Sequence, residues 1–92
     1  MPNEYLTIAE LEVIRARCSA ASPGPWRSFI EGRDHTSGSD FIAVGEGAER
    51  KDIELTGATV YDQDFIASSR TDIILLLDEV VKLRKEVGLD LT

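Results

Sequence analysis

The sequence predicts an α+β fold with an N-terminal helix, a small three-stranded antiparallel sheet and a long C-terminal helix, in the order α-β-β-β-α. Two observations carry this prediction. Apolar residues recur every three or four positions near both ends of the chain, and the middle holds three short segments separated by polar turns. Ninety-two residues make a single domain, 1–92. Because so short a chain buries a small share of its surface, we expect it to be oligomeric.

The first helix is expected over residues 8–21, after a short lead-in over 1–6. Thr7 and Glu10 have the spacing of a capping box, in which each side chain accepts a hydrogen bond from the other residue's backbone N–H. Apolar side chains follow at three- and four-residue spacing and form one stripe of an amphipathic helix. The helix is expected to end before Ser22, because a residue that precedes proline avoids the α conformation.

Three strands are expected between the helices. The rigid turn 23–25 leads into a first strand over 26–32, in which even-numbered residues share one face and odd-numbered residues the other. The pattern does not decide which of these faces points inward. A short apolar run over 41–45 and an alternating segment over 52–57 complete the set. Since the connecting loops are too short for helical crossovers, the strands form an antiparallel sheet.

The C-terminal third predicts a helix over residues 62–87, with Asp62 as its N-cap and Gly88 as its stop signal. Thr71 and the acid that follows it form a second good helix start, so a break near Arg70 stays open. The helix carries a heptad seam with β-branched residues at a and leucine at most d positions. The seam consists of Ile66, Ser69, Ile73, Leu76, Val80, Leu83 and Val87. Further apolar residues widen this face, so one side is expected to cover the sheet and the other to meet a partner helix.

Composition and motifs argue against several classes of function. A net charge of −7 disfavours nucleic-acid polymers, which need a basic face. No stretch approaches the roughly 18 apolar residues of a membrane helix, and the N-terminus lacks a secretory signal, so we expect a cytoplasmic protein. His35 is interpreted as a solvated loop residue and Cys18 as a buried small side chain, far apart and without metal-ligand spacing. Residues 45–50 depart from both glycine-rich phosphate motifs, and we expect no enzyme activity, metal or cofactor.

The remaining pattern suits ligand binding. Seven of the ten basic residues are arginine, whose planar guanidinium binds phosphates with two parallel hydrogen bonds. A flat aromatic ring beside such a group is a common way to hold a base and its phosphates. Arg27 and Arg70 adjoin well-structured parts of the chain. Trp26 has two interpretations, an anchor between helix and sheet or a stacking surface for a ligand. The candidate stacking residues are Trp26, Phe29, Phe41, Tyr61 and Phe65.

Two segments resemble small accessory proteins of temperate phages and prophages, the Ead-like group. They are ARCSAASPGPWRSF at 16–29 and DQDFIASSRTDIILLLDEVVKLR at 62–84, and together they cover less than half of the chain. The matched residues are Ala21, Pro23, Gly24, Pro25, Trp26, Asp62, Phe65, Ile66, Ala67, Ser69, Arg70, Asp72, Ile73, Leu76, Leu77, Glu79 and Val80. Ile74 departs from the family pattern, which has proline there, and implies a straighter helix. Residues 30–58 are not covered by the resemblance.

Part of that group is similar to anti-defence sponges of the Thoeris type, which sequester a cyclic ADP-ribose signal without cleaving it. The resemblance implies a non-enzymatic phage protein, a homodimer or higher homo-oligomer in the host cytoplasm. Its ligand would be a small nucleotide-type immune signal, cyclic ADP-ribose or a cyclic oligonucleotide. The expected ligand-binding residues are Arg27, Arg70, Trp26, Phe65 and Asp72, with rings stacking on a base and arginines on phosphates. The alternatives are a protein-interaction module that docks a host or phage partner through the heptad seam, and a small hydrolase that uses His35.

Overall fold

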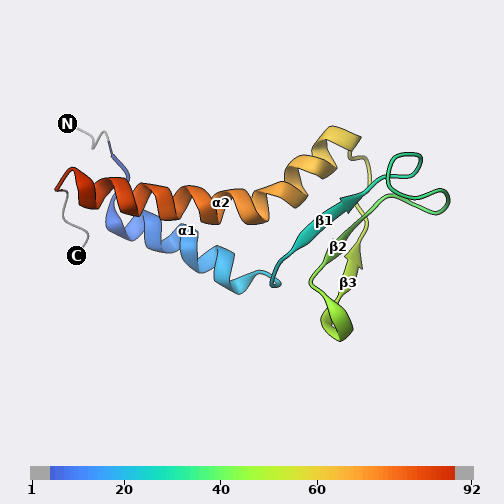
Figure 1. Ribbon diagram of the computed structural model, residues 1–92, viewed down its shortest axis with the longest axis horizontal. Coiled ribbons are helices and arrows are strands. Elements are labelled where there is room, and N and C mark those ends of the chain that lie inside the picture. The colour runs from blue at the N-terminus through green and yellow to red at the C-terminus, as the bar shows by residue number, and fades with distance from the viewer. Residues whose placement is uncertain (1–4, 89–92) are drawn as a thin grey trace. The chain divides into compact units, whose positions relative to one another are not determined.

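The computed structural model describes residues 5–88, so most of the lead-in expected over 1–6, and residues 89–92, lie outside the described part. The elements are α1 (Ile8–Ala20), β1 (Trp26–Phe29), β2 (Phe41–Val44), the 3-10 helix η1 (Gly47–Glu49), β3 (Lys51–Ile53) and α2 (Val60–Glu86) (Figure 1). This order confirms the predicted α-β-β-β-α fold. None of the described helices is long and apolar enough to cross a membrane.

The chain divides into two compact units that share α2. The first, here called the helical unit, comprises the described residues up to Ala21 and those from Ile73 onward. The second, the sheet unit, is Ser22–Asp72 and contains the three strands and the first half of α2. Each unit is described by itself below.

The helical unit pairs α1 with the second half of α2, which run alongside each other (Figure 1). The predicted capping box is present: the backbone N–H of Glu10 donates to Thr7 Oγ1 at 3.0 Å, and that of Thr7 donates to Glu10 Oε1 at 2.8 Å. Leu11 and Leu77 are the buried apolar residues of this unit within the described chain. With so few buried residues, the two helices form only a thin core.

The sheet unit is built on three antiparallel strands with β2 in the middle. Trp26 pairs with Val44 and Phe29 with Phe41, and β2 in turn pairs Ile42 with Ile53. Because residues directly opposite each other share a face of the sheet, the register defines two faces. The inner face carries Trp26, Ser28, Ile42, Val44 and Ile53, and the outer face carries Arg27, Phe29, Phe41, Ala43 and Asp52. The even-numbered residues of β1 are therefore the inward ones.

The first half of α2 covers the inner face. Ile42 and Val44 from β2 and Ala67 from α2 form the buried core of the sheet unit. Gln63 is buried beside them, and its Nε2 donates to Ser28 Oγ at 3.0 Å. The same nitrogen lies 3.2 Å from the carbonyl oxygen of Phe29 and 3.1 Å from that of Phe41. One side-chain amide thus ties the helix to the ends of two strands.

Two predicted boundaries are wrong for local reasons. β1 ends at Phe29 rather than at residue 32, because the backbone N–H of Ile30 donates to Asp34 Oδ2 at 2.8 Å and starts a side-chain-capped turn. Helix α2 begins at Val60, two residues early. Thr59 caps it, and Asp62 is the inside partner of a second capping box rather than the N-cap.

The other end of α2 follows the prediction. The helix is continuous through Arg70, where a break had stayed open, and it ends at Glu86. Gly88 has a φ of 78°, the left-handed conformation that glycine adopts readily after a helix. The third strand is shorter than expected: it ends at Ile53 rather than at residue 57.

Candidate ligand-binding face

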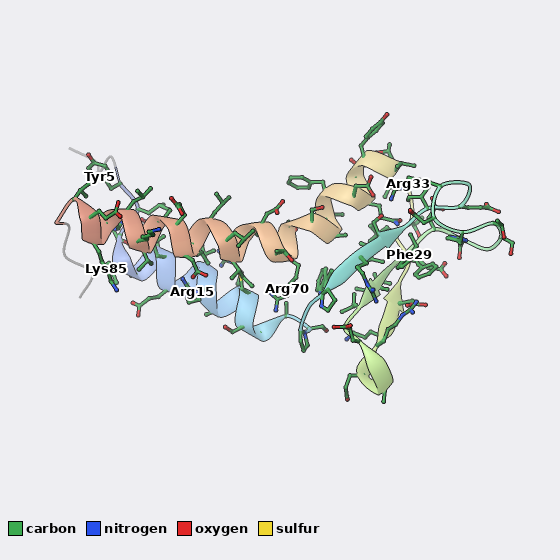
Figure 2. All side chains as sticks on the ribbon, viewed as in Figure 1. Tyr5, Arg15, Phe29, Arg33, Arg70 and Lys85 are labelled. Atoms are coloured by element: carbon green, nitrogen blue, oxygen red, sulfur yellow. The ribbon has the colours of Figure 1, made fainter. Side chains whose placement is uncertain are left out.

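Two of the expected ligand-binding residues meet at a backbone carbonyl of the sheet unit. Trp26 Nε1 donates to the carbonyl oxygen of Ser22 at 3.1 Å, and Arg70 Nε donates to the same oxygen at 3.1 Å. Figure 2 labels Arg70 on α2, beside the start of β1. Trp26 also packs against the core. These contacts stabilise the turn between Ser22 and β1. Trp26 and Arg70 therefore both have a structural role.

The other three expected residues do not join that pair. Arg27 lies on the outer face of the sheet, opposite to Trp26. Phe65 and Asp72 are both exposed on α2, seven residues apart and therefore on one side of the helix. The structure thus brings Trp26 and Arg70 together and leaves Arg27, Phe65 and Asp72 on other surfaces of the sheet unit.

The outer face of the sheet carries an arrangement of rings and guanidinium groups. The rings of Phe29 and Phe41 are stacked, with centroids 5.1 Å apart and an interplanar angle of 17°. Arg27 Cζ lies 6.0 Å from the ring centroid of Phe29, and Arg50 Cζ lies 5.7 Å from that of Phe41. Both distances are in the range of cation–π contacts. These four side chains are here called the arginine–phenylalanine layer.

The register of the hairpin builds this layer. Arg27 and Phe29 are two residues apart on β1 and so point to the same face, and Phe41 is the direct partner of Phe29 across the strands. Ala43 lies on the same face and is fully buried, because its small side chain leaves room for the long ones to lie over it. Arg50 immediately precedes β3 and reaches the layer from the third strand's side.

The two arginines of the layer differ in how they are held. Arg50 Nε donates to Asp52 Oδ1 at 3.1 Å, so a neighbouring carboxylate orients its guanidinium and partly neutralises it. Arg27 is exposed and has no ion-pair partner among residues 5–88. Its guanidinium is therefore the cationic group of this face that is most available to an anion.

Arg33, in contrast, is fully engaged within the sheet unit. Its Nη1 and Nη2 donate to the two carboxylate oxygens of Asp64 at 2.8 and 3.0 Å, and its Nε donates to Asp34 at 2.9 Å. These hydrogen bonds from Arg33 lower the pKa of Asp64 to about 2, and a hydrogen bond from the Ser28 hydroxyl makes a smaller contribution in the same direction. Figure 2 labels Arg33 near the start of α2. Arg33 joins the loop after β1 to α2 and has no free edge for a ligand phosphate.

His35 packs beside the layer, which corrects its interpretation as a solvated loop residue. Its ring centroid lies 5.6 Å from that of Phe41, and its Nδ1 lies 2.8 Å from the carbonyl oxygen of Ser37. Its Nε2 is buried and has no hydrogen-bond partner in the described part of the chain. The carbonyl of His35 accepts from Gly32 at 2.8 Å, which fixes the loop against the sheet. No described nucleophile or carboxylate is paired with this ring.

A groove of about 490 Å³ lies elsewhere on the sheet unit, beside the turn before β1. Its lining includes Glu46, Glu49 and Lys51, two acids against one base. An anion is therefore less suited to this groove than to the outer face. Within residues 5–88, no group of three or more His, Cys, Asp or Glu side chains has the arrangement of a metal site.

Sequence reasoning found part of the layer and missed the rest. Arg27 was an expected phosphate contact, and Phe29 and Phe41 were among the candidate stacking residues. Arg50 was missed, because it was assigned to a turn whose distance from Phe41 depends on strand register. Searches against models of protein families, against curated proteins and against solved structures found no match for this chain.

Proposed function

We propose that this protein binds a small planar anion of the nucleotide type on the outer face of its sheet and sequesters it without cleaving it. The observation that carries the proposal is the arginine–phenylalanine layer, in which two stacked rings are flanked by two guanidinium groups. Bases stack on aromatic rings and on guanidinium planes, while guanidinium edges donate to phosphate oxygens. This one face offers both kinds of contact.

The charges of the chain support a small ligand over a polymer. The protein carries a net charge of −7, so its cationic surface is local. A nucleic-acid polymer requires many basic contacts along its backbone, whereas one or two phosphates require one or two arginines. Arg27 supplies a guanidinium with no ion-pair partner among the described residues, and Arg50 supplies one that is already oriented by Asp52.

The resemblance to small phage proteins adds an expectation about the ligand. In a phage protein, a sequestered nucleotide would be an immune signal of the host, such as cyclic ADP-ribose or a cyclic oligonucleotide. Sequestration requires tight binding and slow release but no stabilisation of a transition state. Trp26 and Arg70 would act indirectly by fixing the start of β1, one residue before Arg27. Phe65 and Asp72 stay candidate contacts that rest on the resemblance alone.

The test is a titration followed by ligand recovery. Cyclic ADP-ribose isomers, cyclic dinucleotides and AMP are titrated separately into the protein by calorimetry, and any bound ligand is recovered after heat denaturation and identified by mass spectrometry. Recovery of intact ligand supports sequestration, whereas a converted product would show an enzyme. Absence of binding to all three probe classes would contradict the proposal.

Variants of the layer locate the site. Arg27→Gln and Arg50→Gln are each expected to weaken binding by about 10- to 100-fold, the usual effect of losing a charge-assisted hydrogen bond. Arg17→Gln is the matched control, because it makes the same chemical change at an exposed position on α1. Equal loss of affinity in Arg17→Gln would show a general effect of charge and would move the site away from the sheet.

A second candidate function is a protein-interaction module. The observation that favours it is the exposure of several large apolar residues along α2, including Leu76 and Val87. If none of the nucleotide probes binds, this helix face becomes the functional surface.

A further inference from the structure

The heptad seam of α2 lies largely on the surface of the helical unit. Leu76 is 65% exposed, Leu83 47% and Val87 69%, and Ile73 is also exposed. Val80 is half-buried. In a single chain, therefore, most of the seam that the sequence predicts is in contact with water. Large contiguous apolar surfaces on a small protein mark a place where another chain binds.

The seam is separate from the stripe that packs on α1. Leu77 is buried, and Leu77 and Val81 line a groove together with Leu11 of α1. Leu76, one residue before Leu77, points about 100° away around the helix axis. The second half of α2 thus has one apolar stripe for α1 and another for which the chain itself provides no described partner.

The helical unit also lacks the burial that a stable pair of helices needs. Its buried apolar residues within the described chain are Leu11 and Leu77, and helix α1 has 13 residues. Isolated helices of that length are marginal in water, and most helical stability in proteins comes from tertiary packing. A second layer of helices on the seam would supply the missing burial.

The charges beside the seam select the orientation of a partner. Glu79 and Glu86 occupy one edge of the seam, at g positions, and Arg84 occupies the other edge, at an e position. In a parallel pair, a g residue faces the e residue five positions later in the partner, so Glu79 faces Arg84. In an antiparallel pair, g faces g and acids meet acids. Arg84 is held beside the seam, because its Nη2 donates to the carbonyl oxygen of Leu6.

We infer that a second copy of this chain packs parallel on the seam, through Ile73, Leu76, Val80, Leu83 and Val87. β-branched residues at a with leucine at d favour two strands over three or four. The complementary edges identify the occupant as the same sequence, since Glu79 of each copy meets Arg84 of the other. Ligand binding on the sheet plays no part in this inference.

The test is the mass of the full chain in solution without nucleotide. Light scattering over a concentration series is expected to give twice the 10.1 kDa of one chain. Leu76→Lys is expected to raise the dissociation constant about 100-fold or more, because it places a charge in the seam. Leu75→Lys is the matched control: Leu75 is 60% exposed, adjacent and off the seam, so this change should leave the dimer intact.

Three outcomes would overturn the inference. They are a wild-type monomer at every concentration, a larger oligomer, and equal disruption by Leu75→Lys and Leu76→Lys. Because packing on the seam supplies burial that the helical unit lacks, Leu76→Lys should lose helix content as it dissociates, whereas Leu75→Lys should keep the circular dichroism spectrum of the wild type. Glu79→Arg tests the orientation. It weakens a parallel dimer, because the new cation opposes Arg84 of the other copy, and adding Arg84→Glu restores the attraction. In an antiparallel pair positions 79 and 84 do not face each other, so Arg84→Glu would not restore the dimer.

Discussion

Replacing Gln63 by leucine should destabilise the sheet unit, because its amide nitrogen lies within hydrogen-bond distance of three oxygens of the strands. The amide is 3% exposed, so water cannot easily take its place. The two hydrogens of its Nε2 are shared among the hydroxyl of Ser28 and the carbonyl oxygens of Phe29 and Phe41. Leucine keeps the approximate volume and removes the donor, which leaves two backbone carbonyls without this hydrogen bond.

The expected loss follows from those two carbonyls. Phe29 and Phe41 are direct partners in the ladder, so each carbonyl keeps a backbone donor and loses only an additional hydrogen bond. Such a bond contributes about 0.5–1.5 kcal/mol, which gives about 1–3 kcal/mol for the pair. In a chain of this size, 1 kcal/mol corresponds to about 4–8 °C in Tm, so the variant should melt at least about 4 °C lower. Ser68→Leu is the control, because it introduces leucine at an exposed position of the same helix and should change stability by less than about 0.5 kcal/mol.

Urea unfolding followed by circular dichroism measures both variants. Gln63→Glu adds a second readout. At neutral pH its carboxylate would face three oxygen atoms, whereas the protonated acid can donate, so this variant should gain stability relative to wild type as the pH falls from 7 to 5. If Gln63→Leu unfolds within about 0.5 kcal/mol of the wild type, the amide does not hold α2 to the sheet as described.

Two further predictions concern the sheet unit. The pKa of Asp64 is lowered from its ordinary value by Arg33, so the stability that this pair contributes is complete above about pH 5 and is lost as the pH falls toward 2. Arg33→Gln should therefore flatten the acid limb of a plot of urea midpoint against pH, and an unchanged limb would refute the role of the pair. Arg70→Ala should cost about 1 kcal/mol, because the Ser22 carbonyl loses one of two donors, and any weakening of nucleotide binding should accompany this loss of stability. Loss of binding at unchanged stability would instead make Arg70 a phosphate contact.

Local sequence signals predicted the helices well. The capping box of Thr7 and the stop at Gly88 depend on residues only a few positions apart, so periodicity and capping rules find them. The end of β1 and the start of α2 were harder to predict. The side chain of Asp34 takes the N–H of Ile30 and ends β1 early, and Thr59 competes with Asp62 for the start of α2. In both places two local signals were present, and the sequence does not rank them.

The candidate face depended on information that periodicity does not contain. Alternation placed Arg27 and Phe29 on one face of β1, and that placement is confirmed. Whether Phe29 meets Phe41, and whether Arg50 reaches them, depends on the register of the hairpins, which a one-residue slip would reverse. Trp26 had two interpretations, an anchor between helix and sheet or a stacking surface for a ligand, and the hydrogen bond from its indole N–H to the Ser22 carbonyl supports the anchor.

The central claim is that the outer face of the sheet binds a nucleotide-type anion through Arg27 and Arg50. Calorimetric titration of cyclic ADP-ribose isomers and cyclic dinucleotides into the wild type and into Arg27→Gln tests it most directly. We predict saturable binding to at least one of these probes, weakened about 10- to 100-fold in the variant and unchanged in Arg17→Gln. Binding that is equally tight in the wild type and in Arg27→Gln, or no binding to any of the probes, would contradict the claim.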